Sequence, residues 1–449
     1  MRALVGVVVA ACALAVSASP QSSAAPRFTT PIHHVVVIYQ ENHSFDNLLG
    51  QLCIEDARSG CDAASSGQLI DGSTVPLTRA TDIVPNVYHL TADQTKAVNG
   101  GAMNGFNTIG ACHHLECYSA FDPSQVPSLA AMARSGAISD RYFSAAGIPS
   151  WGGHVDFAAQ TLDGFVGDNP RNVNGNIRPG WGCDSNRDAA WNDPVTQSVI
   201  YVPSCIPDQN GFGPYRPSPV QYVPTMMDHM DAAGVSWRIY GSSDPTLKHD
   251  RNAYRWNVCP AFAECLYSAQ KNNMMETDQV LTDAADGTLP NFSFIVPSGP
   301  EGQTAQHNSN SMLIGDNWIG KVVSAIQNGP DWASTTIFIT YDDCGCFYDH
   351  VPPPPGLGIR LPLVIVSPYA KAGFTDHDVA TDSSILGYAE HVLGFAPLQT
   401  TSRDGTAYAF RKSFNYHQVP TRPFVFHPTP VPKSSLAYVR THPPVGEDS

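Results

Sequence analysis

Two acidic clusters, each directly after an apolar β-type run, constrain the fold of this chain more than any other feature. Residues 35–40 lead into Glu41 and Asn42, and residues 336–341 lead into Asp342 and Asp343. Runs of β-branched residues that stop at carboxylates are typical of buried strands in an α/β sheet, where ligands collect beyond the carboxyl ends. Four such oxygen-bearing side chains around one point repel each other unless a cation lies between them. The two clusters therefore predict a metal site of the kind found in hydrolases.

The rest of the chain alternates between helical and strand-like segments. Strands are expected at residues 235–240, 292–296, 336–340 and 361–366, and helices at residues 127–134, 225–233, 312–327 and 383–393. Alternation of this kind favours a mostly parallel sheet with helices on both faces. The fold class expected is therefore α/β.

One stretch breaks this alternation and sets the domain layout. Residues 163–219 are rich in Gly, Pro, Asn and Asp, and they are interpreted as an insertion or lid within a catalytic domain spanning residues 31–400. Residues 401–449 are expected to form an irregular C-terminal cover. The lid contains four aromatic side chains that could meet a substrate, namely Trp181, Trp191, Phe212 and Tyr215.

The N-terminus has the features of a secretory signal peptide over residues 1–25. A basic residue, Arg2, precedes an apolar stretch at residues 4–16, and small residues follow. Residues 9–12 resemble a lipoprotein box, but apolar sequence continues after Cys12, so lipidation is not expected. No later apolar run is long enough to cross a bilayer. The protein is therefore expected to be secreted or periplasmic.

The cysteines agree with export. Without Cys12, ten remain, and they lie as close neighbours in the sequence: Cys53 and Cys61, Cys112 and Cys117, Cys183 and Cys205, Cys259 and Cys265, Cys344 and Cys346. In an exported chain this spacing predicts at least four local disulfides. A bridge between Cys344 and Cys346 would be strained, so that pair stays reduced or pairs elsewhere. Zinc-finger spacing is absent from the sequence.

Composition excludes one class of partner. The chain has 449 residues and a formal net charge of -15, whereas a nucleic-acid-binding protein usually presents a basic face. Its hydrophobic fraction of 42% is ample for a large core.

Three motifs resemble one known family and occur in the same order as there. They are ENHSFD at residues 41–46, DRYFSA at residues 140–145 with Pro149 and Ser150 shortly after it, and YDD…FYDHVPPP at residues 341–354. The chain resembles, from about Pro31 to Gly394, the bacterial phosphoesterase family of non-haemolytic phospholipase C and acid phosphatase A. The resemblance implies an alkaline-phosphatase-like sandwich, a hydroxyl nucleophile beside a bound cation, and histidines that hold the phosphate.

Carried over by position, the resemblance makes Ser150 the nucleophile and Glu41, Asn42, Asp342 and Asp343 the metal ligands. A serine that opens a helix more often serves only as a cap. Unpaired backbone N–H groups at a helix N-terminus would, however, also favour a phosphate anion. Ligation by oxygen alone favours magnesium, calcium or manganese before zinc.

The histidines proposed for phosphate contact and leaving-group protonation are His350 in the FYDHV segment, His307, and His89. A single histidine is more often a structural residue than a catalyst, so only the motif positions favour these three. His154, just after Ser150, could be structural.

The function expected is therefore an exported, metal-dependent hydrolase of phosphate mono- or diesters, of acid phosphatase or phospholipase C type. Its partner is a phosphate-ester substrate, phospholipid included. The alternatives are a non-catalytic exported binding protein on the same fold and a sulfatase-like hydrolase. The second is disfavoured because the sequence has no Cys/Ser-x-Pro-x-Arg segment. The substrate, the metal, the pH optimum and the oligomeric state stay open.

Overall fold

The computed structural model describes residues 28, 30–173, 175–244, 246, 251–298, 303–398 and 408–442. The signal peptide expected at residues 1–25 lies outside these ranges. No helix in the described ranges is long and apolar enough to span a bilayer.

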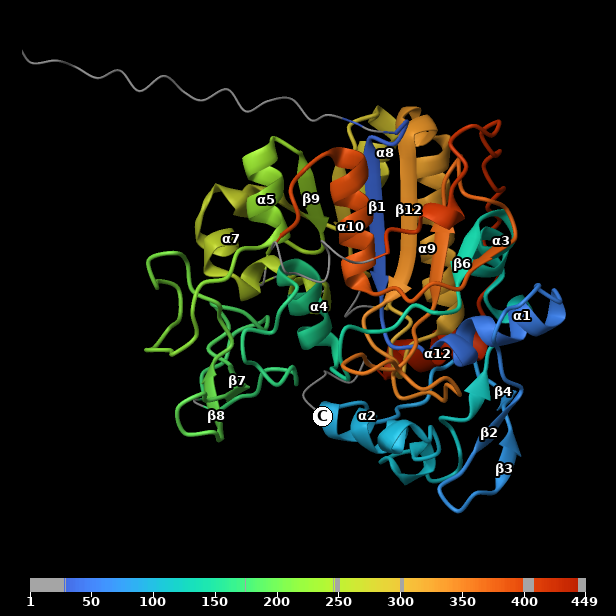
Figure 1. Cartoon of the computed structure of the whole chain (residues 1–449), viewed down its shortest axis with the longest axis horizontal. Helices are drawn as coiled ribbons and strands as arrows, with labels where there is room; N and C mark the ends of the chain where they lie inside the picture. The colour runs from blue at the N-terminus through green and yellow to red at the C-terminus, as the bar shows by residue number, and fades with distance from the viewer. Residues whose placement is uncertain are drawn as a thin grey trace, which may run out of the picture.

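An eight-stranded sheet forms the centre of the molecule (Figure 1). Every neighbouring pair runs parallel except the two pairs that β13 makes with β12 and β6. The strands, in spatial order, are β10 (Met274–Met275), β9 (Trp237–Tyr240), β11 (Phe292–Ile295), β1 (His34–Gln40), β12 (Thr335–Tyr341), β13 (Leu363–Val366), β6 (Ala137–Ser139) and β14 (Phe374–Asp376). The α/β class with a mostly parallel sheet is therefore confirmed.

Strands β1 and β12 are direct neighbours in the middle of the sheet, and their register is the key to the site. Gln40 pairs with Tyr341 at the carboxyl ends of the two strands. All seven residues of β12 are buried, as are six of the seven in β1. The residues that follow, Glu41 and Asp342, consequently leave the sheet at the same point.

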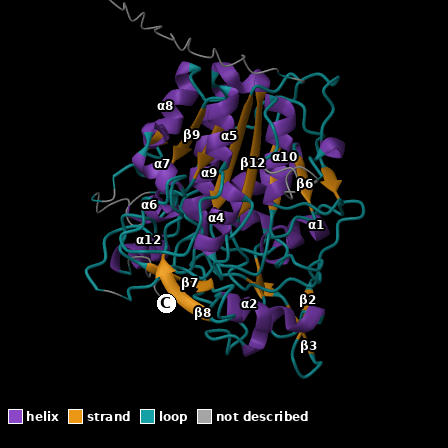
Figure 2. Cartoon of the chain, turned by 60° about the vertical axis from the view of Figure 1, so that its left-hand side comes forward, coloured by secondary structure: helices purple, strands orange, loops and turns teal. Residues whose placement is uncertain are grey.

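Two groups of helices cover the sheet (Figures 1 and 2). In the first, α4 contacts α5, α6 and α10, and in the second, α9 contacts α3 and α8. The bounds are α4 (Ser150–Ala159), α5 (Met226–Ala233), α6 (Arg251–Trp256), α10 (Asp382–Leu393), α3 (Pro127–Ser135), α8 (Gln279–Asp286) and α9 (Met312–Asn328). Successive side chains along β1 point to opposite faces of the sheet. Each face can therefore pack against one of the two groups of helices.

Shorter elements surround this core. The insertion carries a hairpin of β7 (Asp188–Asn192) and β8 (Val199–Pro203). The remaining pieces are α1 (Gln51–Glu55), β2 (Ser66–Gln68), β3 (Thr74–Pro76), β4 (Thr78–Arg79), α2 (Thr91–Val98), β5 (Ser119–Ala120), α7 (Ala263–Tyr267) and α12 (Lys433–Thr441). The last of these is a helix within the segment expected to be irregular.

The expected elements agree with the structure to within a few residues, with one difference in direction. The strand expected at residues 361–366 is β13, which runs against its neighbours instead of with them. Alternation of strands and helices favours parallel pairing, but no helix lies between β12 and β13 in the described chain. The loop at residues 342–362 thus returns the chain beside β12 directly.

Four disulfides form between the cysteines expected to pair. They are Cys53–Cys61, Cys112–Cys117, Cys183–Cys205 and Cys259–Cys265. Cys344 and Cys346 are buried free thiols whose sulfur atoms lie 3.7 Å apart. The prediction of at least four local bridges is confirmed, and Cys344 and Cys346, whose state the sequence left open, are both free.

Candidate active site

The two acidic clusters meet at the carboxyl ends of β1 and β12. Glu41, Asn42 and Asp343 are fully buried, and Asp342 is 1% exposed. Asn42 has a φ of +66°, in the left-handed region that Asn tolerates better than most residues. This turn takes the chain out of β1 while its side chain stays in the cluster. The meeting of the clusters, expected from the sequence, is present.

Asp342 is fixed through one of its two carboxylate oxygens. Its Oδ1 accepts hydrogen bonds from the backbone N–H groups of Asn42 at 3.2 Å and Asp343 at 2.7 Å. Its Oδ2 is buried and has no hydrogen-bond partner in the described part of the chain. A buried carboxylate oxygen without a partner is costly, and a bound cation is one way to satisfy it.

The amide of Asn42 links His89 to the two carboxylates. With its oxygen towards His89, the amide accepts a hydrogen bond from Nε2 at 2.9 Å and donates to Glu41 Oε2 at 2.8 Å and to Asp342 Oδ1 at 3.0 Å. Nδ1 of His89 lies 2.9 Å from the carbonyl of Val87. Asp342 Oδ2 consequently remains the carboxylate oxygen of that residue without a hydrogen-bond partner among the described residues.

Ser150 faces this cluster from the first position of α4. Its hydroxyl donates a hydrogen bond to Glu41 Oε2 at 3.1 Å, and both side chains are fully buried. Glu41 therefore connects the serine to the oxygen cluster. Figure 1 shows α4 beside the ends of β1 and β12, where this contact is made.

The insertion already binds the N–H groups at the start of α4. The N–H of Trp151 donates to Asn169 Oδ1 at 3.0 Å, and that of Gly152 donates to the carbonyl of Gly167 at 3.1 Å. The N–H groups of Trp151 and Gly152 are therefore not the unpaired phosphate donors expected from the sequence. Their partners come from the insertion, which is distant in the sequence, so the pattern around Ser150 could not reveal them.

Two glycines allow α4 to approach the sheet and the insertion closely. A Cβ on Gly153 would lie 3.0 Å from the carbonyl oxygen of Asp342, and one on Gly152 would lie 2.7 Å from that of Gly167. Both neighbours are backbone atoms, which cannot turn away as a flexible side chain can. The small residues after Ser150 thus set its distance from the cluster.

His154 lies one helical turn after Ser150 and also reaches Glu41. Its Nε2 lies 3.6 Å from Glu41 Oε1, and its side chain is 3% exposed. The ring packs edge-on against Tyr39, with ring centroids 4.9 Å apart. Glu41, His154 and Asp342 together could hold a metal ion, since one ligand atom of each lies within 4.8 Å of the others. The i, i+4 spacing from Ser150 is a signal in the sequence that could have indicated this position.

His89 and His307, two of the three histidines proposed to contact the phosphate, are neighbours of each other. The rings of His89 and His307 lie 6.1 Å apart, and His307 also lies 6.3 Å from the ring of Trp256. Nδ1 of His307 is 3.1 Å from the carbonyl of Asn308. The structure thus brings these two expected site residues together, with His89 in direct contact with Asn42.

His350 belongs to a different cluster. Its Nδ1 lies 2.6 Å from Asp46 Oδ2 and its Nε2 lies 2.8 Å from Asp62 Oδ1. Burial acts to lower the pKa of His350, but the hydrogen bond and charge of Asp46 and the charge of Asp349 outweigh it and raise the pKa to about 9. Both ring nitrogens are therefore occupied, and these contacts give no support to a role in protonating a leaving group.

The carboxylates around His350 form an ion-pair network. Asp46, Asp349 and His350 have the spacing of a metal site, but the fully buried Arg360 supplies the positive charge there. Its guanidinium lies 3.1 Å from Asp46 and from Asp349. This arrangement satisfies the buried carboxylates without an ion. The cluster after β1 and β12 is therefore the better candidate for a cation.

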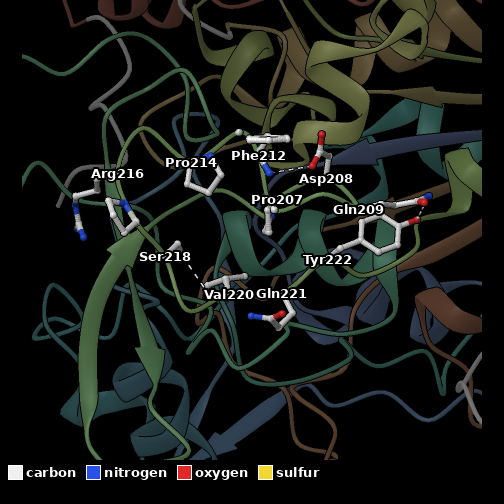
Figure 3. Close-up of a pocket in the computed structure, with 13 residues that line it drawn as sticks. Pro207, Asp208, Gln209, Phe212, Pro214, Arg216, Ser218, Val220, Gln221 and Tyr222 are labelled. Atoms are coloured by element: carbon white, nitrogen blue, oxygen red, sulfur yellow. Dashed lines mark hydrogen bonds between the residues drawn. The ribbon is translucent and has the colours of Figure 1, made fainter.

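The end of the insertion and the residues just after it line a separate pocket of about 390 Å³, within residues 207–222, shown in Figure 3. Phe212, on one side of this pocket, is 71% exposed. The other aromatic residues expected to meet a substrate are turned inward: Trp181 and Trp191 are buried, and the hydroxyl of Tyr215 bonds to Asp188 and to the carbonyl of Arg187. Of the four aromatic side chains, only Phe212 has a ring that is largely exposed to solvent.

A buried hydroxyl held against carboxylates, beyond the carboxyl ends of a parallel sheet, is an arrangement suited to a hydrolytic enzyme. The chain belongs to the Phosphoesterase family, whose model matches residues 32–395. The family resemblance found in the sequence motifs is thereby confirmed, and the chain is a hydrolase that acts on phosphoric esters. The family does not support the binding-protein and sulfatase alternatives.

Several proteins similar in sequence to this chain are phospholipases C. Phospholipase C A of Mycobacterium tuberculosis is 24% identical in an alignment 449 positions long that covers 90% of this chain and 81% of that protein. Non-hemolytic phospholipase C of Pseudomonas aeruginosa is 22% identical over 88% of this chain and 58% of its own length. Non-specific phospholipase C1 of Arabidopsis thaliana is 25% identical over a shorter stretch, 44% of this chain and 41% of that protein.

Proposed function

We propose that this protein is an exported, divalent-metal-dependent phosphoesterase that uses Ser150 as its nucleophile. The observation that carries the proposal is the 3.1 Å hydrogen bond from the Ser150 hydroxyl to Glu41 Oε2 within the oxygen cluster. That contact orients Oγ towards the cluster and provides a carboxylate that can accept its proton.

The residues that would hold the metal are Glu41, Asn42, Asp342 and Asp343. The buried Asp342 Oδ2, which has no hydrogen-bond partner among the described residues, fits a cation. The Asn42 amide lies 2.8 Å from Glu41 Oε2 and 3.0 Å from Asp342 Oδ1, close enough to turn its oxygen to an ion held there. When bound, a divalent ion neutralises charge on the phosphoryl oxygens and lowers the pKa of the attacking hydroxyl. Hard divalent ions prefer such oxygen donors.

The protein's own groups divide the remaining work. Glu41 orients Ser150 and accepts its proton as Oγ attacks phosphorus. The packing of Gly153 against the backbone of Asp342 keeps the hydroxyl close to the cluster. His89 and His307, together beside Asn42, are assigned to phosphate contact and to protonation of the leaving oxygen. His350 is assigned to the ion-pair network instead.

Export is supported by the disulfides. Four bridges in one chain are typical of an oxidising compartment. With the signal-peptide pattern at residues 1–25, they favour a secreted or periplasmic protein.

A phosphodiester with an apolar part, such as a phospholipid, is the substrate class we favour, because relatives across 90% of the chain carry the name phospholipase C. A phosphomonoester is the second candidate. The test compares the purified protein on an aryl phosphate, a bis-aryl phosphate and phosphatidylcholine, with Ser150→Ala as the matched control. We expect the diesters to be turned over and the control to be inactive on all three. Turnover of the monoester alone would exclude the phospholipase C type.

A further inference from the structure

We infer that His154 is a nitrogen ligand of the cation held by Glu41 and Asp342, so that the site selects zinc over magnesium and calcium. This inference rests on the proposed function and concerns the same site. It adds a residue outside the oxygen cluster and reverses the order of metals expected from oxygen ligands alone.

The position of His154 follows from its place on α4. Residues four apart on a helix lie on the same face, so Ser150 and His154 both point towards Glu41. Ser150 Oγ is 3.1 Å from Oε2 of that carboxylate, and His154 Nε2 is 3.6 Å from its Oε1. Ser150 therefore contacts one oxygen of the Glu41 carboxylate, and His154 lies beside the other.

The distance from His154 to Glu41 fits shared ligation better than a direct contact. At 3.6 Å, the two atoms are too far apart for a normal hydrogen bond. Two tetrahedral ligands with bonds of about 2.1 Å to one ion lie about 3.4 Å apart. Asp342 completes the group within 4.8 Å, and its Oδ2 is buried and without a hydrogen-bond partner among the described residues.

The donor atoms decide which ion this group prefers. Imidazole nitrogen suits zinc and other transition metals, whereas magnesium and calcium favour oxygen donors alone. The ring of His154 is also held in place by its edge-on contacts with Tyr39 and Phe294. A buried, orientationally fixed imidazole beside two carboxylates is thus a zinc-type donor set.

A protonated His154 could instead act as the positive counter-charge in place of an ion. The two roles predict opposite effects for His154→Gln. If the imidazolium only balances Glu41, its removal strengthens the binding of every divalent cation. If His154 is a ligand, its removal weakens zinc binding selectively.

The experiment measures metal affinity, not turnover. The full chain is stripped with a chelator, and zinc and magnesium are titrated by competition with a fluorescent chelator. We expect His154→Gln to weaken zinc binding by about 100-fold and to change magnesium binding by less than about threefold. His154→Asp supplies an oxygen donor in place of nitrogen, so it should reduce the ratio of zinc affinity to magnesium affinity. His229→Gln, a half-buried histidine on α5, is the matched control and should change neither affinity.

Cobalt gives an independent readout. Proton NMR of the Co²⁺-loaded protein should show a paramagnetically shifted, exchangeable imidazole N–H signal that His154→Gln removes and His229→Gln keeps. Circular dichroism of the metal-free variants confirms that they fold. Unchanged or tighter zinc binding by folded His154→Gln, with the cobalt signal retained, overturns the inference.

Failure of the inference can be told apart from failure of the proposed function. If Asp342→Asn loses metal while His154→Gln binds zinc normally, the metal site stands and the role of His154 falls. If Asp342→Asn keeps both metal and turnover, the proposed function itself is contradicted.

Discussion

The hydroxyl of Ser150 donates a hydrogen bond to Glu41 Oε2, joining the first residue of α4 to the residue that follows β1. Both side chains are buried, so this contact forms only when the helix packs against the carboxyl edge of the sheet. The arrangement proposed for catalysis therefore depends on the fold as a whole, and separate measurements can test its parts.

Asp342→Asn should abolish metal binding and activity while the metal-free protein stays as stable as the wild type. The substitution removes one of several neighbouring buried carboxylate charges but keeps an oxygen that can accept the backbone N–H groups of Asn42 and Asp343. Thermal unfolding with and without the divalent ion measures this directly. A ligand that binds only the folded state raises stability by about 2.7 kcal/mol at 100 times its Kd. The wild type should show that gain and Asp342→Asn should not; equal gains in both proteins would remove Asp342 from the metal site.

His350→Gln should weaken the fold more than the chemistry. It removes the ion pairs with Asp46 and Asp62, and we expect a loss of about 2 kcal/mol near pH 6, the scale of a hydrogen bond to a charged group. Turnover should fall by less than about tenfold, below the range typical of a lost general acid.

The stability effect of His350 should depend on pH in a defined direction. The pKa of about 9 in the folded protein lies above the ordinary value of 6.5, so its contribution is complete below about pH 6.5 and is lost as the pH rises through about 9. Urea unfolding of both proteins at pH 6 and pH 9.5 should show a smaller difference at the higher pH. A difference that grows with pH would contradict the ion-pair network.

Thiol labelling should find two free cysteines in the mature, denatured protein and almost none in the native one. Cys344 and Cys346 are both buried and free, whereas the other eight are bridged. Non-reducing peptide mapping then assigns the labelled residues. Detection of a Cys344–Cys346 bridge, or of more than two thiols, would show that the bonding differs from that described here.

The meeting of the two acidic clusters could be predicted from the sequence because it depends on local patterns. Residues 35–40 and 336–341 are apolar and β-branched enough to be read as buried strands, and acids follow each. Parallel strands bring such ends to one edge. The pairing of Gln40 with Tyr341 then places Glu41 and Asp342 side by side.

The features that were missed depend on long-range contacts. The reversal of β13 follows from the loop that replaces a crossover helix, and sequence alternation does not reveal it. The partners of His350 come from Asp46 and Asp62, far away in the sequence. Likewise, the donors at the start of α4 are occupied by Asn169 and Gly167 of the insertion. Only His154 carried a local signal, its spacing from Ser150.

Attack of Ser150 on phosphorus is the chemical step on which the proposed function rests. Its most direct test is a single turnover of an aryl phosphate ester, quenched with acid and followed by peptide mass spectrometry. We expect a phosphorylated or phosphodiester-linked peptide with the modification on Ser150. It should be absent from Ser150→Ala, whose turnover should also fall by several orders of magnitude. Near-normal turnover by Ser150→Ala, with an unmodified peptide in the wild type, would instead assign the attack to water.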